Sequence, residues 1–177
     1  MIPITIRDET SRDHEAVRKT HLLAFSEDSP GRLAEDLRQS GSAVISLVAE
    51  QAGHIVGHVL FSRLEAPIRA LTLAPVGIRP DVQKRGIGSA LIRKGLERAK
   101  QEHWQAVFVL GAPAYYGRFG FNASEAQNYN SPYKGPGFMA LLLDETAPKH
   151  GQLVFPAAFA EDIKEHAARE AAHKAKT

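Results

Sequence analysis

The chain contains no cysteine, and that absence excludes three kinds of chemistry. A disulfide framework, a zinc site built on thiolates and a cysteine nucleophile all require residues that are not there. A long uncharged apolar run is missing as well, because no stretch approaches the roughly 20 residues that a membrane-spanning helix needs. The first residues, 1–8, show no basic segment followed by an apolar one. We therefore expect a cytoplasmic protein without a membrane partner.

The chain also has little excess charge of either sign. Its 22 basic and 20 acidic residues leave a formal net charge of +2, which is too small for a protein that binds nucleic acid through general electrostatic attraction. A nucleic-acid partner is therefore not expected. The basic residues do gather on one stretch, which contains Lys84, Arg85, Arg93, Lys94, Arg98 and Lys100. This local cluster needs an explanation of its own.

The chain does contain enough apolar sequence for one core. Of its 177 residues, 44% are apolar and 24% are charged, a composition typical of a single soluble domain. We expect that domain to span residues 1–156. Residues 157–177 are rich in alanine and charge and offer few apolar positions beyond Phe159 and Ile163. They are expected to form a C-terminal helix or a tail.

The order of apolar residues predicts strands and helices near the N-terminus. Residues 2–6 alternate between isoleucine and other residues, as in a strand with one buried face. A helix follows, and its stripe consists of Val17, His21 or Leu22, and Phe25. We expect Pro30–Gly31 to break this helix before a second one at residues 32–39.

Further strands and one long helix are predicted downstream. Two β-branched runs flank residues 51–54 and predict a hairpin. Pro75 cannot donate a ladder hydrogen bond, so it marks an interruption or bulge within the next strand. The predicted strands cover residues 44–50, 55–63, 71–78, 106–110 and 138–143, another starts at Phe121, and the helix covers residues 89–103. This pattern predicts a mixed α/β fold.

The segment Gln83-Lys84-Arg85-Gly86-Ile87-Gly88 has the properties of an anion-binding loop. A glycine-rich turn that opens a helix leaves several backbone N–H groups unpaired at the positive end of the helix dipole. Its two glycines allow a phosphate to approach closely, and its lysine and arginine add positive charge. A Walker A loop is excluded by its missing pattern, and a dinucleotide loop is excluded because Leu91 stands where the third glycine belongs. The alternative is an ordinary turn with a charged edge.

In this context the sequence resembles the GNAT superfamily of acyl-CoA-dependent N-acyltransferases. The pyrophosphate loop of that family, Gln/Arg-x-x-Gly-x-Gly/Ala, is matched by Gln83-x-x-Gly86-x-Gly88. The resemblance includes the preceding strand, residues 73–80, and the later run Ala114-Tyr115-Tyr116-Gly117-Arg118-Phe119-Gly120-Phe121. It implies a single-domain fold of the α/β (α+β) class, in which helices flank a mixed central sheet of about six to seven strands. In that fold a central pair of strands is bulged and splayed apart.

The resemblance also implies where acetyl-CoA, the cosubstrate, is bound. The backbone of the bulged strand would pair with the pantetheine arm, and the amides of the loop would hold the pyrophosphate. The implied cofactor-binding residues are Val76, Gly77, Ile78, Gln83, Lys84, Arg85, Gly86, Ile87, Gly88 and Ser89. No metal is implied.

The second motif supplies a candidate general acid. Collapse of the tetrahedral intermediate expels a thiolate, and a phenol that protonates the sulfur improves that step. The resemblance gives this role to Tyr116, with Tyr115 as the alternative, since adjacent helical residues point about 100° apart. Packing of both tyrosines in the core is the other interpretation. The motif departs from the family at Leu110 and Pro113, where many relatives have Asn and Ala.

The sequence does not identify a general base. Several members of the family carry a carboxylate on the bulged strand, but residues 70–78 contain no Asp, Glu or His. His58 and Glu65 border the neighbouring strand, and His58 is interpreted as a strand histidine that is exposed or satisfied by packing. Glu27 and Asp28 are interpreted as part of a solvated turn. The base is expected elsewhere, or a chain of waters carries the proton.

These observations predict an acetyl-CoA-dependent N-acetyltransferase that acts directly on a primary amine. A non-catalytic acetyl-CoA sensor is the alternative, and nucleic-acid binding through the basic stretch is a third hypothesis, tested by its salt dependence. The acceptor is expected to be a small molecule, with a protein amine as the alternative. Tyr129, Tyr133 and Phe138 suggest an aromatic wall for it. Both a monomer and a homodimer agree with the sequence.

Overall fold

The computed structural model describes residues 2–176 and divides into two compact units. The first unit contains the residues up to Ser62 together with Leu73–Glu102. The second contains Arg63–Thr72 together with the residues from His103 onward. Strands β3 (His54–Leu64) and β4 (Ala70–Ile78) have residues in both units. A single domain over residues 1–156 stays a prediction.

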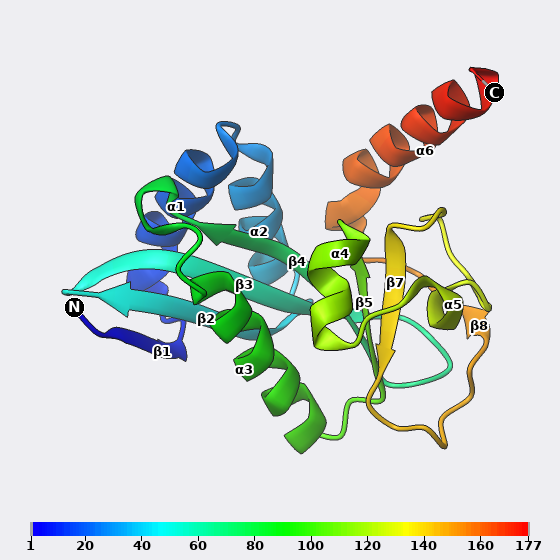
Figure 1. Ribbon diagram of the computed structural model, residues 1–177, viewed down its shortest axis with the longest axis horizontal. Coiled ribbons are helices and arrows are strands. Elements are labelled where there is room, and N and C mark those ends of the chain that lie inside the picture. The colour runs from blue at the N-terminus through cyan, green and yellow to red at the C-terminus, as the bar shows by residue number, and fades with distance from the viewer. Residues whose placement is uncertain (1, 177) are drawn as a thin grey trace. The chain divides into compact units, whose positions relative to one another are not determined.

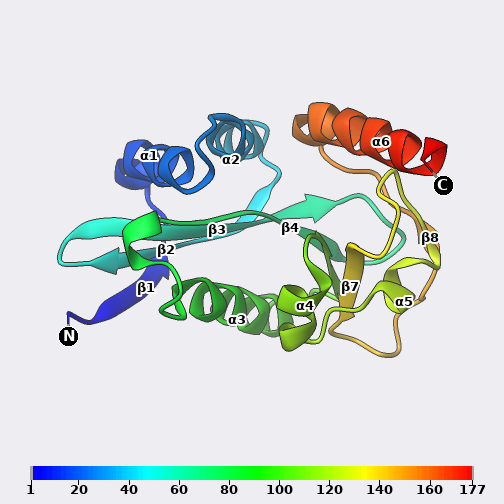
Figure 2. The same ribbon diagram turned by 45° about the horizontal axis from the view of Figure 1, so that its top comes forward.

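In the first unit, strands and helices follow one another in the predicted order (Figure 1). Its elements are β1 (Ile4–Asp8), α1 (His14–Phe25), α2 (Ser29–Gln39), β2 (Ala43–Gln51), most of β3, the end of β4 and α3 (Ile87–Gln101). Helices α1 and α2 cover one face of its strands and α3 covers the other (Figure 2). The predicted hairpin is present, and it turns at Ala52 and Gly53, whose φ angles are 51° and 78°. Two positive φ angles are what a two-residue hairpin turn of this type requires.

The predicted helix break at Pro30–Gly31 is wrong. Helix α1 ends before Ser26, which is left-handed with φ of 55°, and α2 already begins at Ser29. Pro30 lies in the first turn of α2. At that position its missing N–H group has no intrahelical partner to lose, and its fixed φ suits the helix. The proline therefore starts a helix rather than ending one.

Six strands form one mixed sheet in the order β1-β2-β3-β4-β5-β7. The pairs β1–β2 and β2–β3 are antiparallel, β4 is parallel to β5 (Ala106–Leu110), and β5 is antiparallel to β7 (Phe138–Leu142). The parallel pairing joins residues 70–72 of β4 to residues 106–108 of β5. A mixed sheet of six strands with flanking helices confirms the predicted fold class.

The second unit contains the remaining elements. They are α4 (Pro113–Tyr116), α5 (Ala123–Ala126), β5, β7, the short parallel pair β6 (Tyr129–Asn130) and β8 (Gly151–Gln152), and α6 (Ala160–Ala175). The strand predicted at Phe121 is wrong, since only a single bridge joins Asn122 to Ala140. The Asn122 side chain accepts a hydrogen bond from the backbone N–H of Glu125 at 2.9 Å. It therefore caps α5 instead of continuing a strand.

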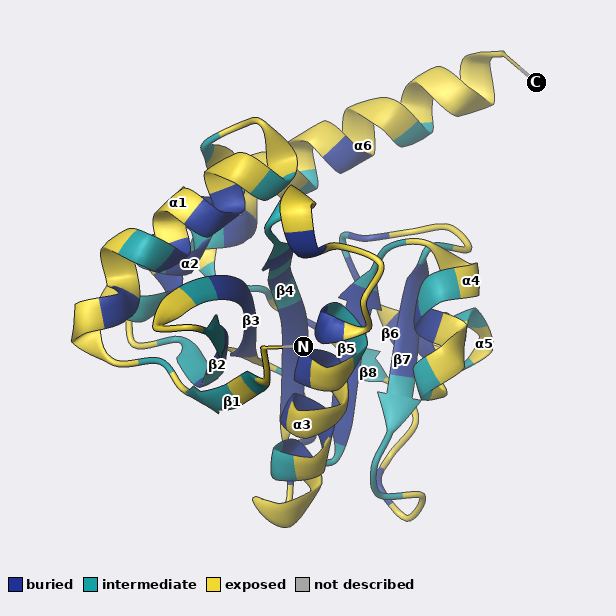
Figure 3. Cartoon of the chain, turned by 60° about the vertical axis from the view of Figure 1, so that its left-hand side comes forward, coloured by how far each residue is buried: buried dark blue, intermediate teal, exposed yellow. Residues whose placement is uncertain are grey.

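Helix α6 is exposed along most of its length (Figure 3). It is nevertheless docked within the second unit, because Phe159 before its start is 2% exposed and His166 is 6% exposed. The Nε2 atom of His166 accepts a hydrogen bond from the backbone N–H of Lys134 at 3.0 Å. The C-terminal segment is thus a surface helix held at its first two turns. Within residues 2–176, every helix is too short or too polar to cross a lipid bilayer.

Candidate active site

The loop before α3 has the geometry of an anion-binding turn. Gly86 is the N-cap of α3 and is left-handed with φ of 82°, and Lys84 is left-handed with φ of 62°. From Lys84 to Gly88, no backbone N–H group has a backbone acceptor within residues 2–176. A Cβ atom added at Gly86 would meet no atom within 4 Å. These N–H groups are therefore available to a ligand at the positive end of a 15-residue helix.

Gln83 ties this loop to the end of the preceding strand. Its Nε2 atom donates a hydrogen bond to the carbonyl oxygen of Ile78 at 2.9 Å. A single 3₁₀ turn, Pro80–Val82, lies between the two residues. The backbone N–H of Gln83 donates to the carbonyl oxygen of Pro80 at 3.4 Å. Both groups of the first motif residue are thus engaged within the fold, and the N–H groups available to a ligand begin at Lys84.

Two glycines hold α3 close to β3. A Cβ atom at Gly95 of α3 would lie 2.2 Å from Cε2 of Phe61 of β3, and one at Gly57 of β3 would lie 3.1 Å from Cδ1 of Leu91 of α3. The first separation does not occur between non-bonded carbon atoms, and the second is shorter than an ordinary van der Waals contact. The distance between helix and strand therefore depends on glycine at both positions, and it fixes where the N-terminus of α3 lies.

Two residues of the basic stretch lie in the loop, and others form ion pairs along α3. Lys84 and Arg85 are exposed in the loop. Arg98 forms an ion pair with Asp8 at 2.5 Å, and Lys94 forms one with Glu97 at 3.6 Å. The cluster seen in the sequence therefore includes two exposed loop charges and two residues that form ordinary ion pairs on a helix surface.

The three residues expected along the cofactor lie at the end of β4. Val76, Gly77 and Ile78 follow the cis peptide bond between Ala74 and Pro75 and lie beyond the part of β4 that pairs with β5. Gly77 is buried, and a Cβ atom added there would lie 2.5 Å from Nδ1 of His21. Helix α1 therefore packs directly onto the backbone of this strand.

A chain of buried polar side chains lies beneath α1 in the first unit. Nε2 of His21 is 2.8 Å from Nδ1 of His58, and Nε2 of His58 is 2.8 Å from Oγ of Ser46 and 3.3 Å from Oε2 of Glu9. Ser46 donates its hydroxyl proton to Glu9. Arg38 forms an ion pair with the other carboxylate oxygen at 2.9 Å. We name Glu9, Ser46, His58 and His21 the buried chain.

Burial and neighbouring charges set the ionisation of this chain. Burial lowers the pKa of His21 to about 3, His58 and Arg38 act in the same direction, and Glu9 opposes them. Burial likewise lowers the pKa of His58. Burial alone would raise the pKa of Glu9, but hydrogen bonds with His58 and Ser46 and the charge of Arg38 lower it to about 2. At neutral pH both histidines are neutral and Glu9 is ionised.

Tyr116 lies at the end of α4 in the second unit and is 9% exposed. Its ring fills the space beside Gly111, where a Cβ atom would lie 2.4 Å from the ring. Burial, and then the neighbouring Tyr115, raise the pKa of Tyr116 to about 12. No hydrogen bond to its hydroxyl group is found within residues 2–176. Tyr115 is half-buried under the guanidinium of Arg118, 4.5 Å from its ring centre.

The other carboxylates considered as bases are engaged elsewhere or exposed. Asp28 forms an ion pair with Arg18 at 2.9 Å, and Glu65 belongs to a backbone bridge in the second unit. Glu27 is exposed in the connection between α1 and α2. His58 is satisfied by contacts inside the fold, in agreement with its interpretation from the sequence.

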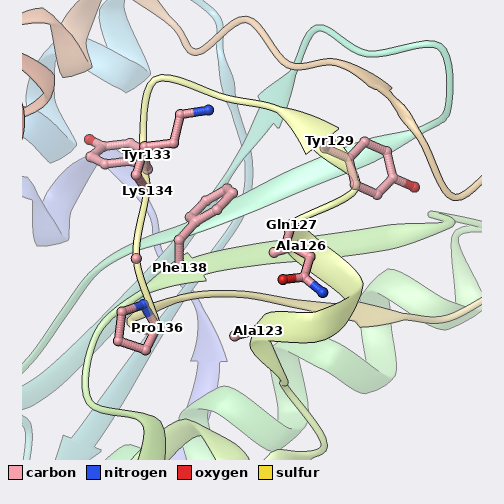
Figure 4. Close-up of a pocket in the computed structure, with 9 residues that line it drawn as sticks. Ala123, Ala126, Gln127, Tyr129, Tyr133, Lys134, Pro136 and Phe138 are labelled. Carbon is pink, nitrogen blue, oxygen red and sulfur yellow. The ribbon is translucent and has the colours of Figure 1, made fainter.

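The second unit contains a cavity of about 400 Å³, and Tyr129, Tyr133 and Phe138 all line it (Figure 4). These are the residues expected to form an aromatic wall. The hydroxyl group of Tyr129 donates to the carbonyl oxygen of Pro148 at 2.7 Å, and that of Tyr133 donates to Asp162. Because both phenol groups are already engaged, they stiffen the wall and leave its ring surfaces to a ligand.

The expected cofactor-binding residues, 76–78 and 83–89, all lie in the first unit, and Tyr116 lies in the second. The sequence alone does not reveal the buried chain. A histidine on the apolar stripe of α1 was the available signal, but its partner His58 is 37 residues away. No local pattern connects positions so far apart.

Comparison with known proteins identifies relatives of this chain in one family. The model of the acetyltransferase (GNAT) family matches residues 6–121, more than half of the chain. The Escherichia coli (strain K12) protein YjhQ, described as an uncharacterized N-acetyltransferase, is 35% identical over 133 residues, which are 70% of this chain and 73% of that protein. YhbS from the same strain, with the same description, is 28% identical over 134 residues, which are 73% of this chain and 80% of that protein.

Solved structures share the fold. A GNAT family acetyltransferase from Brucella melitensis, in complex with acetyl-CoA, has a TM-score of 0.76 and 30% identity, over 90% of this chain and 99% of that one. YhbS from Escherichia coli, in complex with CoA, has a TM-score of 0.83 over 90% of this chain and 93% of that one, and at 24% identity it shows the fold alone. Sequence, sheet order and relatives agree: the chain belongs to the acetyltransferase (GNAT) family and is an acyltransferase.

Proposed function

We propose that this chain transfers the acetyl group of acetyl-CoA directly to a primary amine. The family supports the reaction class, and the loop between β4 and α3 is the observation that carries the choice of cosubstrate. The Brucella melitensis relative was solved with acetyl-CoA, which supports the same cosubstrate here. Because the chain has no cysteine, the transfer cannot pass through an acyl-cysteine on this chain.

The residues present fit acetyl-CoA as a ligand. The backbone N–H groups of residues 84–89 would hold the pyrophosphate, with Lys84 and Arg85 supplying exposed positive charge. Gly86 has open space in front of it, so an anion can approach its backbone closely. Val76, Gly77 and Ile78 would run along the pantetheine arm and bind it through backbone groups.

Tyr116 is proposed as the group that assists the departing sulfur. With a pKa of about 12 it keeps its proton at neutral pH, but it is a weaker acid than an ordinary phenol. A free thiol has a pKa of about 8.5, so full proton transfer to an exposed thiolate would be uphill. Its role is to donate a hydrogen bond as charge develops on sulfur, and proton transfer follows where burial raises the pKa of the thiol as well.

The proposed acceptor is a small-molecule amine with an apolar body. The cavity in the second unit, about 400 Å³, is within the usual range of small-molecule sites. Its aromatic wall favours apolar contacts over hydrogen bonds, because the phenol groups of Tyr129 and Tyr133 are engaged. A protein amine is the other acceptor class, and the two are separated by offering both with acetyl-CoA.

Thermal unfolding with acetyl-CoA, CoA, ATP and NAD tests the proposal. A ligand at 100 times its dissociation constant stabilises the folded state by about 2.7 kcal/mol. For a chain of this length the unfolding midpoint should then rise by roughly 5 to 10 °C with acetyl-CoA and CoA, and not with ATP or NAD. No shift with either CoA species would contradict the proposed function.

Two glycine variants make this test specific for the loop. Gly86 and Gly53 have nearly equal φ angles, 82° and 78°, and open space around them. Alanine at either position is strained by about 1 to 2 kcal/mol. Gly86→Ala should weaken the acetyl-CoA shift, whereas Gly53→Ala, in the hairpin turn, should lower the midpoint without changing the shift. Equal shifts in both variants would remove the loop from the binding site.

A further inference from the structure

The Nδ1 atom of His21 is buried and has no hydrogen-bond partner within residues 2–176. His21 is 0% exposed, and a buried polar atom without a partner has given up its hydration without compensation. Such atoms are rare in folded proteins, and each one calls for an explanation. This nitrogen lies against the backbone of Gly77, where a Cβ atom would be 2.5 Å away.

The hydrogen bonds behind His21 fix which of its nitrogens carries the proton. Ser46 donates to Glu9, so the Ser46 oxygen and the Glu9 carboxylate both act as acceptors toward Nε2 of His58, at 2.8 and 3.3 Å. His58 must therefore be protonated on Nε2, and its Nδ1 accepts from Nε2–H of His21 at 2.8 Å. His21 is left with a lone pair and no proton on Nδ1.

The charged groups around the buried chain come from several elements. Ionised Glu9, which follows β1, attracts a proton toward His21 through His58. Arg38 of α2 opposes protonation of both histidines, and His14 of α1, 3.9 Å from Glu9, acts on His58 in the same sense. The resting His21 is therefore neutral, and the carboxylate at the far end of the chain stabilises the imidazolium once a proton arrives.

Phe25 forms the outer layer over His21. The two rings are stacked, with centroids 6.0 Å apart and an interplanar angle of 19°, and Phe25 is itself 43% exposed. Its Cε2 atom would lie 3.3 Å from a Cβ atom at Gly77. Phe25 is thus the exposed residue that contacts both His21 and Gly77, and an amine that reaches Nδ1 from this side must displace its ring. Within residues 2–176 no group of three His, Asp or Glu side chains is arranged to hold a metal ion, so metal ligation does not explain the free nitrogen.

We propose that His21 is the general base of the acetyl transfer, and that Glu9, Ser46 and His58 hold it in the tautomer with a free Nδ1. This inference rests on the proposed function, which runs the cosubstrate along residues 76–78, beside that atom. It gives the reaction the base that β4 lacks. His21 touches the substrate amine, whereas His58 and Glu9 act through it as positioning residues.

The proposed step balances. The lone pair of the neutral amine forms the C–N bond to the acetyl carbon, and the C–S bond breaks with its electron pair on sulfur. One proton leaves nitrogen for Nδ1 of His21, and sulfur gains one from Tyr116 or from water. The products are the N-acetyl amine and CoA. His21 then gives its proton to water, and Tyr116, where it has protonated the sulfur, takes a proton back from water. A weak base suffices, because nitrogen that has attacked a carbonyl is positively charged and far more acidic than the free ammonium.

The variant His21→Gln separates the role of His21 as a base from its role as a hydrogen-bond donor inside the fold. A glutamine amide reaches the place of Nε2 and keeps a donor for His58, but it has no basic atom at the place of Nδ1. His54→Gln, at an exposed histidine of β3, is the matched control. We expect His21→Gln to lower kcat for a panel of alkylamines and arylalkylamines by about 10²-fold or more. The amine KM and the thermal shift with acetyl-CoA should stay near those of the wild type, and His54→Gln should match the wild type throughout.

A second measurement, of the protonation of the two histidines, requires no acceptor amine. In ¹⁵N NMR spectra of the histidine-labelled full chain at pH 7, Nδ1 of His21 should be unprotonated and Nε2 of His58 protonated. A proton on Nδ1 of His21, or a His21→Gln rate within twofold of the wild type, overturns the inference. A wild-type chain that binds acetyl-CoA but acetylates no amine overturns it too. A chain that gives no thermal shift with acetyl-CoA contradicts the proposed function itself, which is a distinguishable result.

Discussion

At the scale of single residues, burial moves two pKa values in opposite directions. It raises the pKa of Tyr116 to about 12 and lowers that of His21 to about 3. The physical cause is the same, because a buried site disfavours whichever form carries the charge. At neutral pH the phenol therefore holds its proton and the imidazole lacks one. A proposed proton donor must hold a proton before the reaction, and a proposed proton acceptor must lack one.

Tyr116→Phe removes one hydroxyl group and keeps the ring that packs beside Gly111. If the phenol assists the departing sulfur, kcat should fall by about 10²-fold, while the thermal shift with acetyl-CoA is kept. Steady-state kinetics that follow the release of CoA thiol measure the change. Tyr115→Phe is the matched comparison, because Tyr115 is the alternative acid from the sequence and its ring is held under Arg118. Equal losses in both variants would contradict the assignment to Tyr116.

Residue by residue, the sequence predicts what lies within a motif and misses what depends on distant partners. The loop glycines and Tyr116 belong to short patterns that can be read locally. His21 could be placed on a buried helix face, but its tautomer depends on Ser46 and Glu9, which are far away in the chain. Burial follows from periodicity, whereas the hydrogen-bond partner of a buried group does not.

At the scale of elements, the feature that matters is the close seating of α3 on β3. Glycine in a helix normally costs about 1 kcal/mol relative to alanine. At Gly95 alanine is unfavourable despite its higher helix propensity, since a Cβ atom would lie 2.2 Å from the ring of Phe61. The large aromatic ring occupies the room that the missing side chain leaves.

Gly95→Ala should therefore destabilise the protein, although the same change in most helices stabilises it. We expect the free energy of unfolding to fall by about 1 to 3 kcal/mol, as for other overpacked cores. Chemical denaturation measures it, with Gly117→Ala as the control, because Gly117 has φ of −56° and no atom within 4 Å of an added Cβ. A Gly95→Ala protein as stable as the wild type would mean that Phe61 can move aside at little cost.

Most strands could be predicted from the sequence. Two predictions failed, the helix break at Pro30 and the strand at Phe121, and each has a physical reason. The predicted strands at 44–50, 55–63, 71–78 and 106–110 agree with β2 to β5 within one residue at every boundary, because alternation and β-branching are strong local signals. Pro30 and Asn122 misled the prediction. A proline can start a helix as well as break one, and an asparagine after an apolar residue can be a helix cap.

At the scale of the whole molecule, buried titratable groups tie stability to pH. His21 has a pKa of about 3 in the folded state against an ordinary value of 6.5, and Glu9 has about 2 against 4.5. Both pKa values are depressed, so the unfolded chain takes up protons first as pH falls. Their contribution to stability is complete above pH 6.5 and is lost between pH 6.5 and 2.

The free energy of unfolding should thus begin to fall below about pH 6.5 and fall more steeply below about pH 4.5, where Glu9 adds to His21. Urea denaturation at a series of pH values measures this curve. His21→Phe should flatten the part between pH 7 and 5, and His54→Phe, at an exposed site, should leave it unchanged. A wild-type stability that is constant from pH 7 to 4 would contradict the neutral, buried state of His21.

The buried chain also affects how the first unit unfolds. Glu9, His21, Arg38, Ser46 and His58 belong to five different segments, and each finds its partners only when the others are in place. A partly folded form that lacked α1 or α2 would lose His21 or Arg38, and with it part of the hydrogen-bond and ion-pair network that stabilises the folded unit. Intermediates of this kind are therefore suppressed, and the loss of either helix should carry the strands β1 to β3 with it in one cooperative transition.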